Sequence, residues 1–388
     1  MSNVVAQNAC APIPALNPEK WEQVIFTEHP QHDTMWTMIR GHDGHIYIGL
    51  CLESRGGGVA QLYKYDTKEH RLIALADMGE VTGELPDSGH ATQGKIHFSL
   101  CHARNGNKIF GATHCTTPPM GHPIWSPFSM WGDPVMNFPG GHIFSHDIQS
   151  GITTDFGVIV PNEGIPYLML DENRGYLYGV TYPRAHFFRT DLVGRHFKDY
   201  GRISGMYPIS MIFDTDGNLF TSDSSSRLIK YDVSQDRIRF LGVKPYCQPW
   251  NLTGYASWIT DMGHGTDGFI YGCSYSNDHL FRFDPKQEEP VIEDLGPGLE
   301  DRPSRNLRCI VADHKGHFYY TANPMLDSRA NNVLVRYNIA SRKKELIGIM
   351  SLNGKHYYPW RAVCMPDNTI YFACIHGSPP SMLVYHPD

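Results

Sequence analysis

Two short stretches of the sequence carry side chains that could together move a proton beside a bound anion. Residues 95–114 contain His97 and His114, and residues 167–184 contain Tyr167, Tyr182 and Arg184. Imidazole is a base near neutral pH, a phenol donates a proton, and guanidinium holds a carboxylate through a fixed fork of N–H groups. Removal of the weakly acidic proton next to a uronate carboxyl, with loss of the neighbouring glycosidic oxygen, needs these three types of group.

Further aromatic and cationic residues occupy comparable places along the chain. No carboxylate falls among them, whereas glycosidases of the usual kind use a pair of carboxyl groups. Aromatic faces suit pyranose rings and arginines suit a carboxylate, so we expect an anionic carbohydrate as the ligand. The residues expected to bind it are His97, Tyr182, Arg184, Tyr207, Trp258, Arg308, Arg361 and His376.

All of these residues belong to a unit that the sequence repeats seven times. In each unit a turn precedes an alternating strand, a more apolar strand comes before the turn, and a second alternating strand follows. The 37 glycines and 27 prolines suit so many tight turns. The turn-and-strand segments are DGHIYIGL from Asp43, NGNKIFGAT from Asn105, RGYLYGVT from Arg174, DGNLFTSD from Asp216, DGFIYGCS from Asp267, KGHFYYTA from Lys315 and DNTIYFAC from Asp367.

Four strands in about 50 residues form one blade of a β-propeller, so the repeats predict an all-β, seven-bladed β-propeller. The seventh unit lacks a fourth strand. We expect the N-terminal segment WEQVIFTE, Trp21–Glu28, to close the last blade and so protect a sheet edge. The expected organisation is one domain over residues 1–388, with an N-terminal extension at 1–20 and an inserted loop at 116–141.

The propeller geometry predicts where the site lies. The first strand of a blade begins at the same face of the ring at which the second strand ends. Residues at these strand ends therefore converge around the central channel, and loops held by a rigid scaffold are common ligand sites.

At these residues the sequence also resembles a known family. KIHFSL followed by GATHC, and PYLMLD followed by RGYLYGVTYPR, are similar to segments of the seven-bladed propeller polysaccharide lyases, the ulvan lyases and rhamnose–glucuronate lyases. The resemblance implies that His114 and Tyr167 perform the acid/base work and that Arg184 and His97 bind the uronate. The aromatic, proline-rich stretch GHPIWSPFSMWGDPVMNFPGG departs from the family pattern.

No cofactor is expected, although a metal remains an alternative. His142 with His146, or Cys101 with His102 and Cys115, could contribute ligands to a divalent ion such as Mn, Ca or Zn. The propeller oligogalacturonate lyases use a histidine-bound manganese, which makes a metal-dependent lyase one alternative. A lactonase-like hydrolase and a protein-binding scaffold are two others. The former needs Glu, Asn and Asp ligands around the axis, and the latter's WD and GH signatures are absent from the repeats.

Composition narrows the choice of partners. A formal net charge of -7 argues against a nucleic-acid partner. No apolar run approaches the roughly 18 residues of a membrane-spanning helix, so no membrane partner is expected. The nine cysteines lack close pairing and the start of the chain lacks a secretory pattern, which favours reduced thiols and a cytoplasmic location. The oligomeric state stays open.

Overall fold

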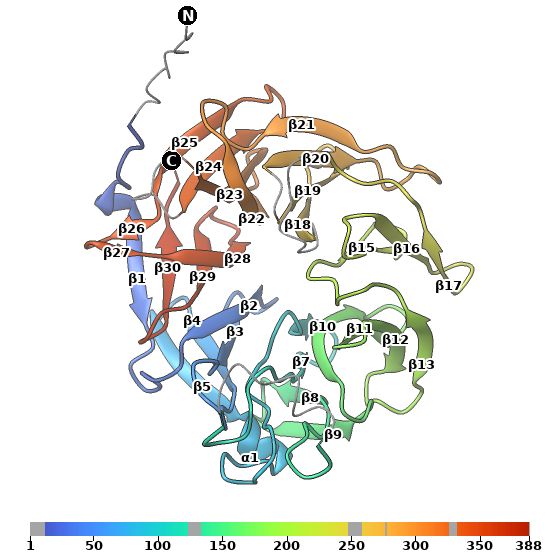
Figure 1. Cartoon of the computed structure of the whole chain (residues 1–388). Helices are drawn as coiled ribbons and strands as arrows, with labels where there is room; N and C mark the ends of the chain where they lie inside the picture. Colours follow the sequence, from blue (N-terminus) through green and yellow to red (C-terminus); the bar gives the residue numbers. More distant parts are fainter. Residues whose placement is uncertain (1–11, 123–132, 247–257, 276–277, 326–331, 388) are drawn as a thin grey trace, which may run out of the picture.

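Seven four-stranded antiparallel sheets follow one another around a central axis (Figure 1). The computed structural model describes residues 12–122, 133–246, 258–275, 278–325 and 332–387. The prediction of an all-β, seven-bladed propeller is confirmed. Residues 1–11 of the expected extension and 123–132 of the expected inserted loop lie outside the described residues.

Each of the first six sheets is built from four strands that are consecutive in the chain. The first three blades are β2 (Thr34–Arg40), β3 (Ile46–Cys51), β4 (Gln61–Asp66) and β5 (Arg71–Asp77); β6 (Cys101–Ala103), β7 (Lys108–Ala112), β8 (His142–Asp147) and β9 (Thr153–Val158); β10 (Gly164–Asp171), β11 (Tyr176–Tyr182), β12 (His186–Asp191) and β13 (Lys198–Arg202).

Blades 4 to 6 repeat the same order of strands around the ring. They are β14 (Ile212–Phe213), β15 (Leu219–Ser222), β16 (Leu228–Asp232) and β17 (Arg237–Phe240); β18 (Ile259–His264), β19 (Ile270–Ser274), β20 (His279–Phe283) and β21 (Glu293–Pro297); β22 (Ser304–Ala312), β23 (His317–Pro324), β24 (Val333–Asn338) and β25 (Lys344–Ile349).

The seventh blade joins the two ends of the chain. Its strands are β28 (Tyr358–Cys364), β29 (Ile370–Ile375), β30 (Ser381–Tyr385) and β1 (Trp21–Ile25). Trp21 pairs with Tyr385, and their rings stack with centroids 4.5 Å apart. The predicted closure by the N-terminal strand is therefore confirmed.

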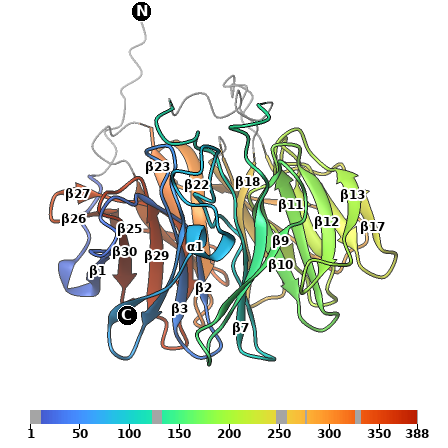
Figure 2. The same ribbon diagram turned by 90° about the horizontal axis from the view of Figure 1, so that it is seen from below.

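Little structure lies outside the blades in the described residues. It comprises the 3-10 turn η1 (Pro18–Lys20), the short helix α1 (Met78–Thr82) and the hairpin of β26 (Ser351–Leu352) and β27 (Lys355–His356). Seen from the side, the blade strands run between the two faces of the ring (Figure 2). Within the described ranges, no helix is long and apolar enough to span a bilayer, and the seven cysteines there are free thiols.

A glycine and an aromatic ring recur opposite each other in several blades. Gly111 of β7 pairs with Phe144 of β8, and Gly179 of β11 pairs with Phe188 of β12. In both pairs the phenylalanine ring lies over the glycine, and a Cβ on the glycine would overlap it. The glycine in motifs such as LYGVT is thus required by the close approach of a ring.

Carboxylates explain why the third strand of most repeats ends in a small polar residue. The Asp66 carboxylate accepts hydrogen bonds from the backbone N–H groups of Lys68 and Glu69, each at 3.1 Å. Asp147 repeats this with Gln149 and Ser150. Such local bonds favour a tight turn over continued strand, so these residues end the third strand and begin the turn to the fourth.

The inner strands of blades 2 and 4, β6 and β14, are shorter than the repeats predict. KIHFSL is not a continuous strand of blade 2, because its Phe98 forms a bridge to Tyr167 of blade 3 instead. The backbone N–H of Phe98 donates to Pro166, and that of Leu168 donates to Phe98. This segment therefore couples blades 2 and 3 at the centre of the ring.

Candidate functional site

The strand ends named in the sequence analysis gather at one edge of the ring. Gly164, at the start of β10, pairs with Tyr182, at the end of β11, and Thr34 pairs with Cys51 in the same way in blade 1. We call this edge, where first strands begin and second strands end, the front face. Most predicted site residues belong to these strand ends or to the loops beside them, whereas Tyr167, Arg308 and Arg361 lie further along their first strands.

His97 and His114 form an imidazole pair at the front face of blade 2. Their ring centroids are 5.6 Å apart, and His97 and His114 are 2% and 0% exposed. Among the residues that the structure describes, both ring nitrogens of His114 and Nδ1 of His97 have no hydrogen-bond partner. Burial, reinforced by the charge of Lys95, holds both pKa values well below 6.5. Both imidazoles are therefore neutral at neutral pH and can accept a proton.

The position of His114 depends on a glycine of the neighbouring blade. His114 bonds Lys95 through backbone N–H and C=O groups, both at 2.9 Å, which ties the strand end to the KIHFSL segment. Its imidazole lies against Gly164, the first residue of β10, and a Cβ there would overlap Nδ1 of His114. Gly164 is thus a part of the site that sequence reasoning missed, with no signal beyond its place before PYLML.

Two phenols contact the imidazole pair. The ring of Tyr182 lies 4.8 Å from that of His114, and Tyr207 lies 6.2 Å from His114 and 6.0 Å from His97. The two phenol rings are 5.2 Å apart. Burial raises the pKa of both phenols, so each keeps its proton and can donate it. Tyr207 is half-buried and contacts both histidines.

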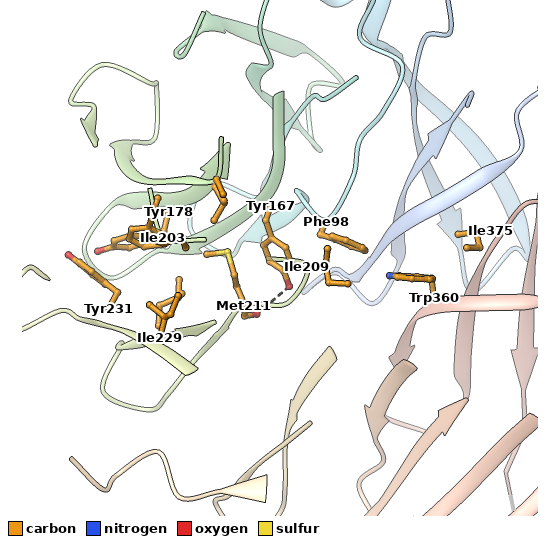
Figure 3. Packing of buried hydrophobic residues seen from close by; sticks show 14 residues of the cluster. Phe98, Tyr167, Tyr178, Ile203, Ile209, Met211, Ile229, Tyr231, Trp360 and Ile375 are labelled. Carbon is orange, nitrogen blue, oxygen red and sulfur yellow. Dashed lines mark hydrogen bonds between the residues drawn. The ribbon is translucent and has the colours of Figure 1, made fainter. Parts of the chain in front are cut away.

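Tyr167 lies deeper, toward the centre of the ring. Its hydroxyl donates to the Met211 carbonyl at 3.3 Å, and its ring contacts Phe98 with centroids 5.6 Å apart, as Figure 3 shows. Among the described residues no ring contact joins Tyr167 to His114. The sequence paired these two residues for proton transfer, whereas the phenols that contact His114 are those of Tyr182 and Tyr207.

Arg361 lies near the centre of the ring and forms a buried ion pair. Its guanidinium bridges to Asp261, donates to the Ile209 carbonyl at 2.7 Å, and lies 4.2 Å from the Phe98 ring centroid. Asp261 also accepts the backbone N–H of Ile310 at 3.0 Å. This guanidinium therefore bonds within the fold and links several blades, although the sequence analysis expected it to bind substrate.

Arg184 is the arginine at the rim beside Tyr182. Its side chain is 68% exposed, and its Nε lies 3.3 Å from Oε1 of the buried Glu163. The backbone N–H of Arg184 donates to the other carboxylate oxygen of Glu163 at 3.2 Å. The pairing holds the side chain at the front face while leaving the guanidinium open to solvent.

A lysine and a glutamate missed by sequence reasoning lie next to the imidazole pair. Lys95 is 5% exposed, and its Nζ is 2.9 Å from Oε2 of Glu53. Trp36 donates its indole N–H to the same carboxylate, and its ring contacts His97 at 4.8 Å. The expectation that no carboxylate lies at this face is wrong, since Glu53, Glu163 and Asp261 are there. Each of these carboxylates is paired with a cation. The only sign of the Lys95–Glu53 pair in the sequence was the position of Lys95, a charged residue facing inward in an apolar segment.

His376 lies beside this cluster in blade 7. Its ring is 6.5 Å from that of Trp36. A pocket of about 390 Å³ opens next to it at the front face and connects the histidine with Glu53. The pocket is lined by Asp33, Thr34, Glu53, Ser54, His376 and Ser378.

The remaining predicted residues, Trp258 and Arg308, lie in blades 5 and 6. The Trp258 ring is 6.2 Å from that of Tyr275, and the Arg308 guanidinium is 4.6 Å from the Trp360 ring. Trp360 contacts Trp36 at 4.9 Å. A wall of aromatic rings therefore runs from blades 5 and 6 to the imidazole pair.

The candidate metal ligands form other bonds. In the described part of the chain, no three His, Cys, Asp or Glu side chains are grouped as a metal would require. His142 bonds Asp155 at 2.9 Å and Glu84 at 3.0 Å through its two nitrogens. His146 Nδ1 bonds Thr153. The other candidate ligands, Cys101, His102 and Cys115, also form hydrogen bonds within the protein. Cys101 bonds Leu168, His102 bonds the backbone of His42, and Cys115 bonds Thr117.

The two carboxylates give His142 a pH-dependent role in stability. Burial disfavours its charged form, but the bonds to Asp155 and Glu84 outweigh burial and raise its pKa to about 9. A raised pKa contributes stability that is complete below 6.5 and is lost as the pH rises through about 9. We expect His142→Gln to lower the free energy of unfolding by about 1–2 kcal/mol at acid to neutral pH, after allowance for solvent screening. The difference should disappear at pH values above the raised pKa, as urea unfolding of both proteins would show. An equal loss of unfolding free energy at neutral pH and above the raised pKa would contradict a charged His142.

Comparisons with known proteins show a similar fold and no related sequence. We found no match to the sequence among protein-family models or among curated proteins. A catalytically inactive virginiamycin B lyase from Staphylococcus aureus, solved with quinupristin, has a TM-score of 0.64 at 12% identity, over 95% of this chain and 99% of that one. YCF48 bound to D1 peptide has a TM-score of 0.60 at 12% identity, over 97% of this chain and 98% of that one.

A third similar structure is a longer protein. The extracellular domain of the two-component system BT4673 from B. thetaiotaomicron has a TM-score of 0.61 at 11% identity. The match covers 95% of this chain but only 40% of that one. Identities this low show a shared propeller fold, which hosts many functions, so function has to be argued from the site.

Proposed function

We propose that the protein is a carbon–oxygen lyase that cleaves uronic-acid-containing oligosaccharides by β-elimination. The observation that carries the proposal is the buried His114 imidazole, whose two nitrogens have no partner among the described residues and which contacts two protonated phenols. A buried polar group without a partner costs about 1–3 kcal/mol, which a fold retains where the group has a chemical task.

The proposed reaction uses two proton transfers. Neutral His114 takes the proton from C5 of the uronate while the C4–O bond breaks. The electron pair of the C5–H bond forms the C4=C5 double bond, and the departing oxygen receives a proton from the Tyr207 hydroxyl. Transfer of the abstracted proton from His114 to Tyr207 restores both groups. The contacts of Tyr207 with both histidines support it as the acid.

The same arrangement implies how substrate is admitted and held. The imidazole pair is buried and Tyr207 contacts both of its rings, so we expect the phenol ring to move when a sugar binds. Arg184 is exposed next to Tyr182 and would bind the carboxylate of the reacting uronate. Its charge stabilises the negative charge that develops as the C5 proton leaves.

The direct test is formation of an unsaturated uronate. Incubation with glucuronate-containing oligosaccharides should produce ultraviolet absorbance from a C=C bond conjugated with the carboxylate. The activity should persist in a chelator, and its loss there would favour the metal-dependent lyase. Absence of any unsaturated product across glucuronate, iduronate and galacturonate oligosaccharides would contradict the proposal.

Tyr207 and Tyr167 can be told apart by removing one hydroxyl at a time. Tyr207→Phe should lower kcat by about 10²–10⁴-fold, the usual contribution of a general acid, with little change in KM. Tyr167→Phe removes a hydroxyl bonded to the Met211 carbonyl and should change kcat only a few fold. Steady-state kinetics of both variants, with thermal melts to verify folding, checks the assignment. The reverse outcome would restore the role that the family resemblance implies for Tyr167.

A further inference from the structure

Arg308 is a buried cation of the front face. It lies in the middle of β22, is 9% exposed, and its Nε donates to Oδ1 of Asn306 at 2.9 Å. The Trp360 and Tyr275 rings lie 4.6 and 5.5 Å from the guanidinium carbon. Within the described residues no carboxylate lies at ion-pair distance from it. Burial accordingly lowers its pKa.

The other inward cations of this face differ from Arg308 in having a carboxylate partner. Arg361 pairs with Asp261, and Lys95 pairs with Glu53. A buried charge without a counter-ion is strongly unfavourable, because the interior does not replace its hydration. Among the described residues there is a carboxylate counter-charge for Lys95 and Arg361 but none for Arg308, which points to an anion supplied from outside.

Two buried polar groups lie in the part of blade 5 that contacts Arg308 through Tyr275. Within the described residues, the indole N–H of Trp258 and the hydroxyl of Ser274 are buried without a hydrogen bond. Trp258 contacts Tyr275, which follows Ser274 and lies beside the Arg308 guanidinium. In the described part of the chain, the Trp258 indole and the Ser274 hydroxyl are thus two donors of blade 5 without a protein acceptor, and the Arg308 guanidinium of blade 6 has no carboxylate partner. Such groups suit a bound carboxylate.

The Arg308 cluster is separate from the imidazole pair. Trp360 and Trp36 lie between them, with successive ring contacts from Trp360 to Trp36 at 4.9 Å and from Trp36 to His97 at 4.8 Å. An anion bound at Arg308 is therefore not the carboxylate of the sugar that reacts at His114. The aromatic wall between the two places suits the faces of intervening pyranose rings.

We propose that Arg308, with Trp258 and Ser274, forms a subsite for the carboxylate of a second uronate in the same oligosaccharide. The class of ligand rests on the proposed function. The subsite would favour substrates that carry acidic groups on more than one sugar and would set the register in which the chain lies across the front face.

The test is a binding experiment in which no turnover occurs. In the full-length His114→Gln protein, tryptophan fluorescence is titrated with a glucuronate-containing tetrasaccharide and with its carboxyl-reduced counterpart. We expect the acidic sugar to bind more tightly and Arg308→Gln to weaken its binding at least tenfold while leaving the reduced sugar unaffected. Arg308→Lys, which keeps the charge and loses the fork, should lie in between. Arg174→Gln, at the β10–β11 turn on the opposite face, is the matched control and should bind like the parent.

Thermal melts separate binding from folding. Because Arg308 has no carboxylate partner in the described part of the chain, Arg308→Gln should melt at the parent temperature or higher. An unchanged preference for the acidic sugar in Arg308→Gln would overturn the proposal. If that variant does not fold, unchanged affinity in Arg308→Lys would overturn it as well, since the residue would then act in folding alone. Arg308-dependent binding without unsaturated product from the wild-type protein would retain the subsite and refute the lyase. Unsaturated product together with binding that does not depend on Arg308 would retain the lyase and refute the subsite.

Discussion

Replacement of His114 by glutamine is expected to lower kcat for β-elimination by about 10²–10⁴-fold. The neutral imidazole is the group that accepts the C5 proton, and glutamine fills a similar volume without being a base. Stability should stay within about 1 kcal/mol of the wild type, because neither nitrogen of His114 has a hydrogen-bond partner in the described ranges. Steady-state kinetics followed by the absorbance of the unsaturated product, with thermal melts, would measure both effects.

His146 provides the matched control for His114. It is another buried histidine of blade 2, 2% exposed, and its Nδ1 bonds the Thr153 hydroxyl at 2.9 Å. His146→Gln should therefore lower the melting temperature slightly and leave kcat unchanged. Equal losses of activity in both variants would mean that the effect of His114→Gln is structural and would remove His114 from the mechanism.

His114 also determines how kcat/KM is expected to depend on pH. A base must be unprotonated to act, and burial holds the pKa of His114 well below 6.5. The logarithm of kcat/KM should therefore rise with pH only in the acid range and be constant through neutral pH. Because burial also raises the pKa of Tyr207, the alkaline decrease belongs above the usual phenol pKa of 10.0. An increase of kcat/KM whose midpoint lies at neutral pH would mean that a group other than His114 is the base.

Replacement of Arg361 by glutamine is expected to cost about 3–5 kcal/mol of folding free energy, the loss typical of a broken buried ion pair. Asp261 would remain buried with its carboxylate unpaired, although it keeps the backbone N–H of Ile310. The bond to Ile209 and the contact with Phe98, from two other blades, would be lost as well. Urea or thermal unfolding of the purified variant would measure the loss.

A double-mutant cycle identifies the source of that loss. Asp261→Asn with Arg361→Gln removes both charges, so it should recover a large part of the stability lost by Arg361→Gln alone. Arg282→Gln is a suitable comparison, since it breaks a partly exposed pair with Glu293 on the outer side of blade 5. A stable Arg361→Gln protein with weakened substrate binding would reverse the assignment and return Arg361 to the ligand.

The architecture could be predicted in detail because its causes are local in sequence. The turn residues, the alternation along each strand and the asparagine or aspartate after the third strand all act within one hairpin, as Asp66 and Asp147 show. Closure of the ring by Trp21–Ile25 followed from counting strands. The inner strand of blade 2 was predicted less well, because Phe98 pairs with a different blade.

The candidate site was predicted only in part, because its contacts join different blades. The repeat placed His97, His114, Tyr182 and Tyr207 near the front face from sequence alone. The repeat could not show which phenol contacts His114, since that depends on the loop that carries Tyr207 and on the close approach allowed by Gly164.

Sequence by itself determined the scaffold and the types of residue that face the channel, whereas the tertiary structure decided their charges and partners. Arg308 and Arg361 occupy equivalent positions in neighbouring repeats, yet Arg361 is neutralised by Asp261 from blade 5 and Arg308 has no counter-ion in the described residues. Periodicity specifies on which face of a strand a side chain lies, because it follows from bond geometry within the strand. The partner of that side chain depends on how separate blades pack, which no pattern within one repeat contains.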